Sequence, residues 1–135
     1  MSINYTHVAA RLPAQDLDRA RAFYAEKLDL HPVDERPGGL LYRIGACEFA
    51  LFQSTGRASG EHTQMGFLVE DIDAAVAEMK ARGVVFEEVE APGLATRGGI
   101  ADIAGNYPSK GSSGERAGWF RDSEGNLLGI GQLMR

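Results

Sequence analysis

The chain has 135 residues, of which 44% are hydrophobic and 24% are charged, and its formal net charge at pH 7 is -5. These values are ordinary for one globular domain, and the negative charge disfavours nucleic acid and anionic membranes as partners. Cys47 is the only cysteine, so no disulfide can form within the chain, and no apolar run approaches the roughly 18 residues that span a membrane. The first residues lack a signal-peptide pattern, and we expect a cytoplasmic protein.

The first half of the chain combines one amphipathic helix with several strands. Residues 5–12 are predicted to form a strand that ends at Pro13. Asp16 is placed to cap the helix that follows, and apolar residues at spacings of three and four continue from Leu17 to Leu28. Three further short strands are predicted, separated by glycine-containing turns, at residues 31–35, 40–44 and 48–53.

The second half repeats this order. A strand at residues 62–69 leads to Asp71, the predicted cap of a second amphipathic helix that ends at Gly83. A hairpin turn is predicted at residues 122–126, where Gly125 supplies the positive φ. The remaining strands are predicted at residues 84–89, 117–121 and 127–133.

An internal repeat relates the two halves. His7 precedes Asp16 by nine residues, His62 precedes Asp71 by nine residues, and the two pairs lie 55 residues apart. We therefore predict a single domain over residues 1–135, with module one at about 4–55 and module two at about 61–134. The second copy is longer by about 24 residues, which we place in a glycine-rich insertion at about 92–118 and expect to form a partly ordered lid.

Three segments carry a resemblance to a known family. They read LPAQDLDRARAFY at residues 12–24, GFLVEDI at residues 66–72 and FRDSEGN at residues 120–126. They resemble the two strand-to-helix junctions and the closing hairpin of the vicinal oxygen chelate superfamily, which includes glyoxalase I, bleomycin resistance proteins and extradiol dioxygenases. The resemblance implies an α+β fold of two βαβββ modules, whose curved mixed sheet forms a half-barrel around a cavity with helices outside. It also implies a homodimer, because such modules often complete each other's cavities across an interface.

The resemblance also locates the positions at which enzymes of this superfamily hold a divalent metal. One residue comes from the first strand and one from the last strand of each module, which gives Ala9, Ala50, Gln64 and Gly129. Alanine and glycine have no donor atom, and a single amide oxygen cannot hold a metal with useful affinity. We predict that the metal site is missing and that no cofactor is bound.

A metal site displaced by two residues is the alternative. Side chains two residues apart share a face of a strand, so His7, Glu48 and His62 could offer two imidazoles and a carboxylate to a divalent metal. Such a site would suit a lyase, isomerase or dioxygenase. The same three residues are the candidates for proton transfer in a reaction without metal, and whether the protein is an enzyme stays open.

Five residues are candidate ligand contacts. Arginines such as Arg11 and Arg43 could bind a carboxylate or phosphate, or could pair with an acid such as Glu48. Aromatic side chains could stack on a ligand or pack in the core. The candidates are Arg11, Tyr42, Gln64, Tyr107 and Trp119.

The leading functional prediction is a protein that binds a small organic molecule in its cavity, with no nucleic acid or membrane partner. If this prediction is correct, we expect the side chains of His7 and His62 to point into a dry pocket. A metalloenzyme with the displaced site is the first alternative. A non-catalytic module that binds a protein partner is the second.

Overall fold

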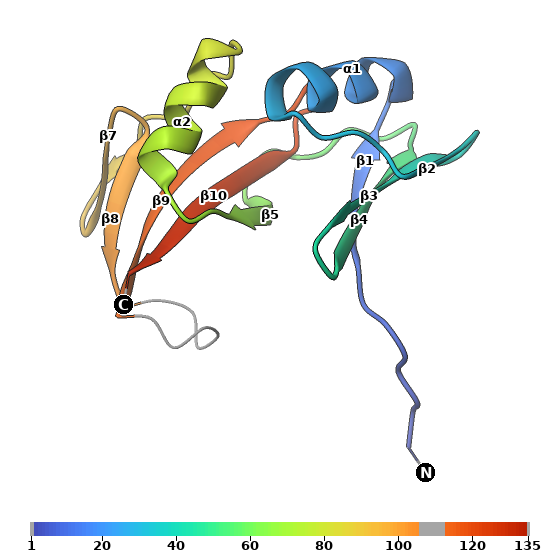
Figure 1. Cartoon of the computed structure of the whole chain (residues 1–135), viewed down its shortest axis with the longest axis horizontal. Coiled ribbons are helices and arrows are strands. Elements are labelled where there is room, and N and C mark those ends of the chain that lie inside the picture. Colours follow the sequence, from blue (N-terminus) through green and yellow to red (C-terminus); the bar gives the residue numbers. More distant parts are fainter. Residues whose placement is uncertain (1, 106–112, 135) are drawn as a thin grey trace.

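The computed structural model describes residues 2–105 and 113–134, which form two sheets and two helices (Figure 1). One sheet has the strand order β1-β4-β3-β2, and the other has the order β5-β10-β9-β8-β7-β6. The helices are α1 (Leu17–Leu28) and α2 (Ile72–Ala81). The strands are β1 (Ala10–Ala14), β2 (Asp34–Arg36), β3 (Gly39–Ile44), β4 (Cys47–Gln53), β5 (Thr63–Leu68), β6 (Glu90–Ala91), β7 (Leu94–Arg97), β8 (Ile100–Ala104), β9 (Gly114–Arg121) and β10 (Leu127–Met134).

The same connectivity occurs in both halves. β1 pairs in parallel with β4, as β5 does with β10, and the other pairs are antiparallel. In each half a helix follows the first strand, and the last strand returns beside that first strand. The predicted α+β fold of two βαβββ modules is therefore confirmed. Each module keeps its own sheet, and in the described residues β1 and β5 lie at sheet edges without pairing with each other.

Both predicted helices are present, and each begins after the aspartate that was predicted to cap it. The Asp16 carboxylate accepts a hydrogen bond of 3.0 Å from the backbone N of Arg19, and Asp71 accepts one of 3.1 Å from Ala74. These bonds satisfy amides that the first turn of a helix leaves without partners. No helix within the described ranges is long and apolar enough to cross a membrane.

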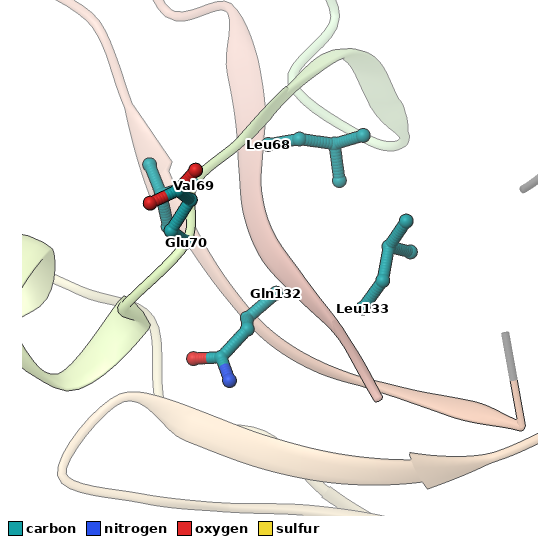
Figure 2. Close-up of a pocket in the computed structure, with 5 residues that line it drawn as sticks. All are labelled: Leu68, Val69, Glu70, Gln132 and Leu133. Carbon is teal, nitrogen blue, oxygen red and sulfur yellow. The ribbon is translucent and has the colours of Figure 1, made fainter. Parts of the chain in front are cut away.

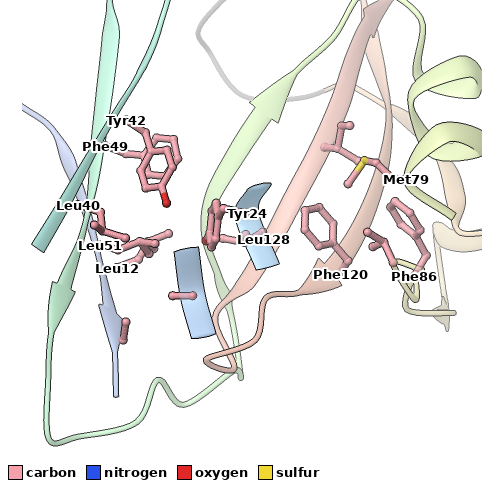
Figure 3. Packing of buried hydrophobic residues seen from close by; sticks show 14 of the residues in the cluster. Leu12, Tyr24, Leu40, Tyr42, Phe49, Leu51, Met79, Phe86, Phe120 and Leu128 are labelled. Carbon is pink, nitrogen blue, oxygen red and sulfur yellow. The ribbon is translucent and has the colours of Figure 1, made fainter. Parts of the chain in front are cut away.

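A single hydrophobic core extends through both modules. Figure 3 shows it running from Tyr42 and Phe49 in module one to Phe120 in module two. The ring of Phe49 on β4 lies 5.9 Å from the ring of Phe67 on β5, measured between centroids. No strand pairing joins the two sheets in the described residues, so side-chain contacts of this kind hold the modules together.

Three sequence predictions differ from the structure. β1 begins at Ala10, not at residue 5, and Pro13 lies within it; β1 is an edge strand, so the missing N–H of proline costs no ladder bond. Residues 84–89 form no strand: Phe86 makes an isolated bridge with Phe120, and Glu87 donates from its backbone N to the backbone O of Trp119.

The third difference concerns the insertion at about residues 92–118. Part of it forms β7 and β8, which extend the six-stranded sheet by antiparallel pairing. Residues 106–112, which include the candidate Tyr107, lie outside the described residues. The lid therefore stays a prediction.

Candidate functional site

Three of the candidate residues, Arg11, Glu48 and Trp119, lie on the faces of the two sheets that point away from the helices. On β1 and β4 the core side chains include Leu12 and Phe49, so the alternating positions Arg11 and Glu48 face the other way. On β9 the buried Phe120 faces the core, so Trp119 faces the other way. We call these two surfaces the helix-free faces.

A three-residue polar cluster occupies the helix-free face of module one. Arg43 donates from Nε and Nη2 to Oε2 of Glu48, at 3.1 and 2.6 Å. Nε2 of His7 lies 3.5 Å from the other oxygen, Oε1, of the same carboxylate. The Glu48 side chain is 23% exposed and the His7 side chain is 59% exposed. The imidazole of His7 therefore lies beside a carboxylate that Arg43 already holds.

The third residue of the displaced metal set is not part of this cluster. His62 is exposed and lies in the segment before β5. In the described part of the chain, no three His, Cys, Asp or Glu side chains are grouped so that they could hold a metal ion. The structure thus brings together His7 and Glu48 but not His62. Both histidines are exposed, and the expectation that they point into a pocket stays a prediction.

The helix-free face of module two centres on Gly129. This residue on β10 lies opposite Trp119 on β9 and opposite Gly66 on β5. A Cβ atom at Gly129 would lie 3.5 Å from Cγ2 of Thr63 and 3.6 Å from Cδ1 and Nε1 of Trp119. The half-buried indole therefore lies alongside a strand surface that carries no side chain at this position.

Gln64 on β5 carries an unsatisfied polar atom. It lies two residues before Gly66 on β5, and its Oε1 is buried with no hydrogen-bond partner among the described residues. Nearly all buried acceptors in proteins are satisfied, so an exception calls for a physical explanation. An N–H or O–H of a bound molecule would satisfy this oxygen once the Gln64 side chain turned to expose it.

Tyr42 is a core residue, which corrects its prediction as a ligand contact. Its side chain is 1% exposed and stacks on Phe49, with centroids 4.9 Å apart. Burial raises the pKa of Tyr42 to about 12. Tyr42 occupies a core position of β3, so its ring faces α1 and not the helix-free face.

The structure contains a pocket that the sequence did not predict. It has a volume of about 400 Å³ and is lined by Leu68, Val69, Glu70, Gln132 and Leu133 (Figure 2). The two leucine side chains lie together on one side, and Glu70 and Gln132 lie on the other. None of the predicted site residues lines it.

The internal repeat points to one residue of this pocket, Gln132. The sequence places Gln132 at the position of Gln53 in the repeat. In the structure Oε1 of Gln132 accepts a hydrogen bond of 3.0 Å from the backbone N of Ile72, at the start of α2. Gln53 donates from Nε2 to the backbone O of Gln15, at 2.9 Å, next to the start of α1. Both glutamines therefore hold a strand-to-helix junction.

The turn between β9 and β10, residues 122–126, is also polar and largely buried, and we call it the polar turn. Glu124 accepts hydrogen bonds from Nε and Nη2 of Arg19, at 2.8 and 2.9 Å, and from the backbone N of Gln15 and Asp16, at 3.0 and 3.1 Å. Burial opposes ionisation of this carboxyl, but hydrogen bonds from Arg19, Ser123 and the backbone outweigh it and lower the pKa of Glu124 to about 2. The carboxylate is therefore a structural contact between the modules.

The rest of the polar turn is held in the same way. Asn126 donates from Nδ2 to the backbone O of Pro13, at 3.0 Å, and to Oδ2 of Asp122, at 2.9 Å. The sequence showed this turn only as a closing hairpin. Its role in joining the modules required the structure.

Comparison with known proteins identifies the family. The model of the Glyoxalase/Bleomycin resistance protein/Dioxygenase superfamily matches residues 4–130. The chain belongs to this superfamily. No curated protein matches the sequence.

Solved structures of the superfamily share the fold at low sequence identity. A glyoxalase/bleomycin resistance protein/dioxygenase from Alicyclobacillus acidocaldarius is 18% identical with a TM-score of 0.68, over 95% of this chain and 91% of that one. A lactoylglutathione lyase from Agrobacterium tumefaciens is 20% identical with a TM-score of 0.63, over 96% and 95%. A glyoxalase/bleomycin resistance protein/dioxygenase from Nocardioides is 18% identical with a TM-score of 0.64, over 99% and 87%. At these identities the likeness concerns the fold alone.

Three of the four positions that the resemblance assigns to a metal, Ala9, Ala50 and Gly129, carry no side-chain donor atom. Ala50 lies opposite Arg11 on β1, and the space beside Gly129 is bordered by an indole and a methyl group. Gln64 supplies one neutral oxygen, whereas divalent metals in proteins need several donors. We therefore derive no step through a metal at this site.

Proposed function

We propose that this member of the superfamily binds a small organic molecule against the helix-free face of module two, without a metal ion. One observation carries the proposal: the buried Oε1 of Gln64 has no hydrogen-bond partner among the described residues. The absence of metal donors at Ala9, Ala50 and Gly129 leaves recognition to the remaining side chains.

The chemistry of this face limits the kind of ligand. The half-buried indole of Trp119 offers an aromatic surface, and aromatic pairs gain about 0.5–1.5 kcal/mol beyond the burial of area. Oε1 of Gln64 can only accept a hydrogen bond. The ligand that fits best is therefore a flat ring that carries an N–H or O–H donor.

Benzimidazole and 1-methylbenzimidazole are suitable probes, because they have similar rings and differ in the N–H donor. Trp119 is the only tryptophan, so its fluorescence reports binding at this face. We expect benzimidazole to bind about tenfold more tightly than the methylated ring, since one hydrogen bond to a buried acceptor is worth about 1 kcal/mol or more.

Two variants check the source of this preference. Gln64→Met removes the acceptor at similar size and should abolish the difference between the probes. Gln15→Met, a matched change at a glutamine of the β1–α1 junction, should keep it. If neither probe binds, or if both bind equally to the unaltered protein, the proposal is wrong.

Metal-assisted chemistry at His7 and Glu48 is the second candidate, favoured by the 3.5 Å contact between them. Equilibrium dialysis of protein purified without a histidine tag, against Zn²⁺, Ni²⁺, Mn²⁺ and Fe²⁺, separates the two candidates. If the protein works without a metal ion, as we propose, none of these four ions should bind in a stoichiometric amount. One bound equivalent that is lost in both His7→Ala and Glu48→Gln would replace it with the second candidate.

A further inference from the structure

A carboxylate lies on the helix-free face of module two. Glu115 is on β9, four residues before Trp119, so alternation along the strand puts both side chains on this face. A Cβ atom at Gly131 would lie 2.1 Å from Oε1 of Glu115, so the carboxylate occupies the space above that glycine. This approach is possible because Gly131 carries no side chain. The strand surface therefore holds a half-buried negative charge at a defined position.

The arginines on the same strand do not neutralise this charge. The side chain of Arg116 points to the opposite face, where it pairs with Asp73 of α2. Arg121 pairs with Glu87. Within residues 2–105 and 113–134, Glu115 forms no salt bridge. A half-buried carboxylate in these surroundings favours a positively charged group from a bound molecule.

The carboxylate lies within reach of a molecule bound beside Trp119. Gly129, which lies opposite Trp119, precedes Gly131 by two residues on the same face of β10. Side chains two residues apart on a strand are separated by about 7 Å, so the carboxylate above Gly131 lies roughly that far along β10 from the indole beside Gly129. An aromatic ring with a short chain that ends in an ammonium group can span this separation.

We propose that the molecule bound on this face is an aromatic amine, whose ring lies beside Trp119 and whose ammonium group pairs with the carboxylate of Glu115. The inference rests on the proposed function, from which it takes the position of the ring. It adds a positive charge to the ligand and makes Glu115 the residue that selects for it. The formal net charge of the chain, -5, also favours the approach of a cation over that of an anion.

Two probes that differ in one charged group test the proposal. 2-(2-Aminoethyl)benzimidazole and 2-propylbenzimidazole share the ring and its N–H, but the first ends in an ammonium group where the second ends in a methyl group. We expect the amine to bind about tenfold more tightly by isothermal titration calorimetry, since a hydrogen bond to a charged group is worth more than a neutral one. A high salt concentration should reduce this preference, because salt screens a partly exposed ion pair.

Two variants check that Glu115 is the source of the preference. Glu115→Gln removes the charge at the same size, so it should abolish the preference for the amine and leave the affinity for 2-propylbenzimidazole unchanged. Glu90→Gln is the matched control, because Glu90 is an exposed acid on β6 of the same sheet, and it should keep the preference. Circular dichroism shows whether each variant is folded. If Glu115→Gln does not fold, the effect of salt on the unaltered protein decides, and a preference that salt does not reduce would overturn the inference.

The results also separate this inference from the proposed function on which it rests. If benzimidazole binds but the amine and the propyl compound bind equally, the inference is wrong and the proposed function stands. A preference for the amine that persists in Glu115→Gln likewise overturns the inference alone. If none of the benzimidazoles binds, both proposals are wrong.

Discussion

Tyr24 on α1 donates a hydrogen bond of 2.7 Å to Oδ2 of Asp122, which lies 98 residues later in the polar turn. Tyr24 is fully buried, and its pKa is raised well above the ordinary value, first by burial and then by the negative charge of Asp122. The bond therefore joins the helix of module one to the turn of module two inside the core.

Removing the Tyr24 hydroxyl should destabilise the protein far more than removing the hydroxyl of Tyr42. Tyr24→Phe leaves Asp122 with one donor fewer, and a buried hydrogen bond to a charged group is worth about 1.5–3 kcal/mol. The Tyr42 hydroxyl is buried without a partner among the described residues, so Tyr42→Phe should be neutral or slightly stabilising. Urea unfolding of the two variants measures the contrast. Equal losses in both would contradict the importance of the inter-module bond.

The stability of the protein should fall steeply in acid because of Glu124. Its pKa is about 2 in the folded protein and near 4.5 in the unfolded chain. A carboxyl whose pKa is lowered by folding stabilises the protein above its unfolded pKa, and this contribution is lost as the pH falls from about 4.5 to about 2. The loss is roughly 3 kcal/mol.

Two variants show whether Glu124 causes the loss of stability in acid. Glu124→Gln should be less stable at pH 7 and should show a flatter dependence of the free energy of unfolding over this pH range. Glu90→Gln, at an exposed acid, should retain the slope of the unaltered protein. If Glu124→Gln kept the full slope, another carboxyl would have to be responsible.

Two glycines of the six-stranded sheet, Gly118 on β9 and Gly66 on β5, should respond differently to alanine. A Cβ atom at Gly118 would lie 2.5 Å from the backbone O of Gly99, whereas one at Gly66 would meet only the backbone O of Gly129 at 3.8 Å. Gly118→Ala must displace backbone, and we expect it to lower the free energy of unfolding by about 1–3 kcal/mol, the usual effect of overpacking. Gly66→Ala should change the free energy of unfolding by about 0.5 kcal/mol or less. Thermal unfolding compares the two, and a larger loss for Gly66→Ala would contradict the packing described at Gly118.

Local sequence signals predicted the helices better than the strands. Asp16 and Asp71 mark both helix starts because capping depends on residues within one turn. The strand predicted at residues 84–89 fails because pairing depends on a distant partner, and there only Phe86 meets Phe120. The start of β1 was misplaced for the same reason, since its register is set by β4.

The candidate site was predicted in part. Alternation with the buried residues Leu12 and Phe120 puts the candidate contacts Arg11 and Trp119 on helix-free faces. Tyr42 shares the core face of β3 with Leu40, and the residue type alone does not reveal that face. Distances between strands of different modules, such as the separation of His62 from His7 and Glu48, depend on how the two sheets pack. No local pattern encodes that packing.

The contacts of the polar turn also set the order in which the protein can be completed during synthesis. Glu124 binds the backbone amides of Gln15 and Asp16, which are made 109 and 108 residues earlier. Contacts so distant in sequence form late, because a long loop must close first. During synthesis on the ribosome, the backbone amides of Gln15 and Asp16 therefore lack their Glu124 acceptor until almost the whole chain has emerged. The N-terminal half becomes fully stable only when the last hairpin has formed.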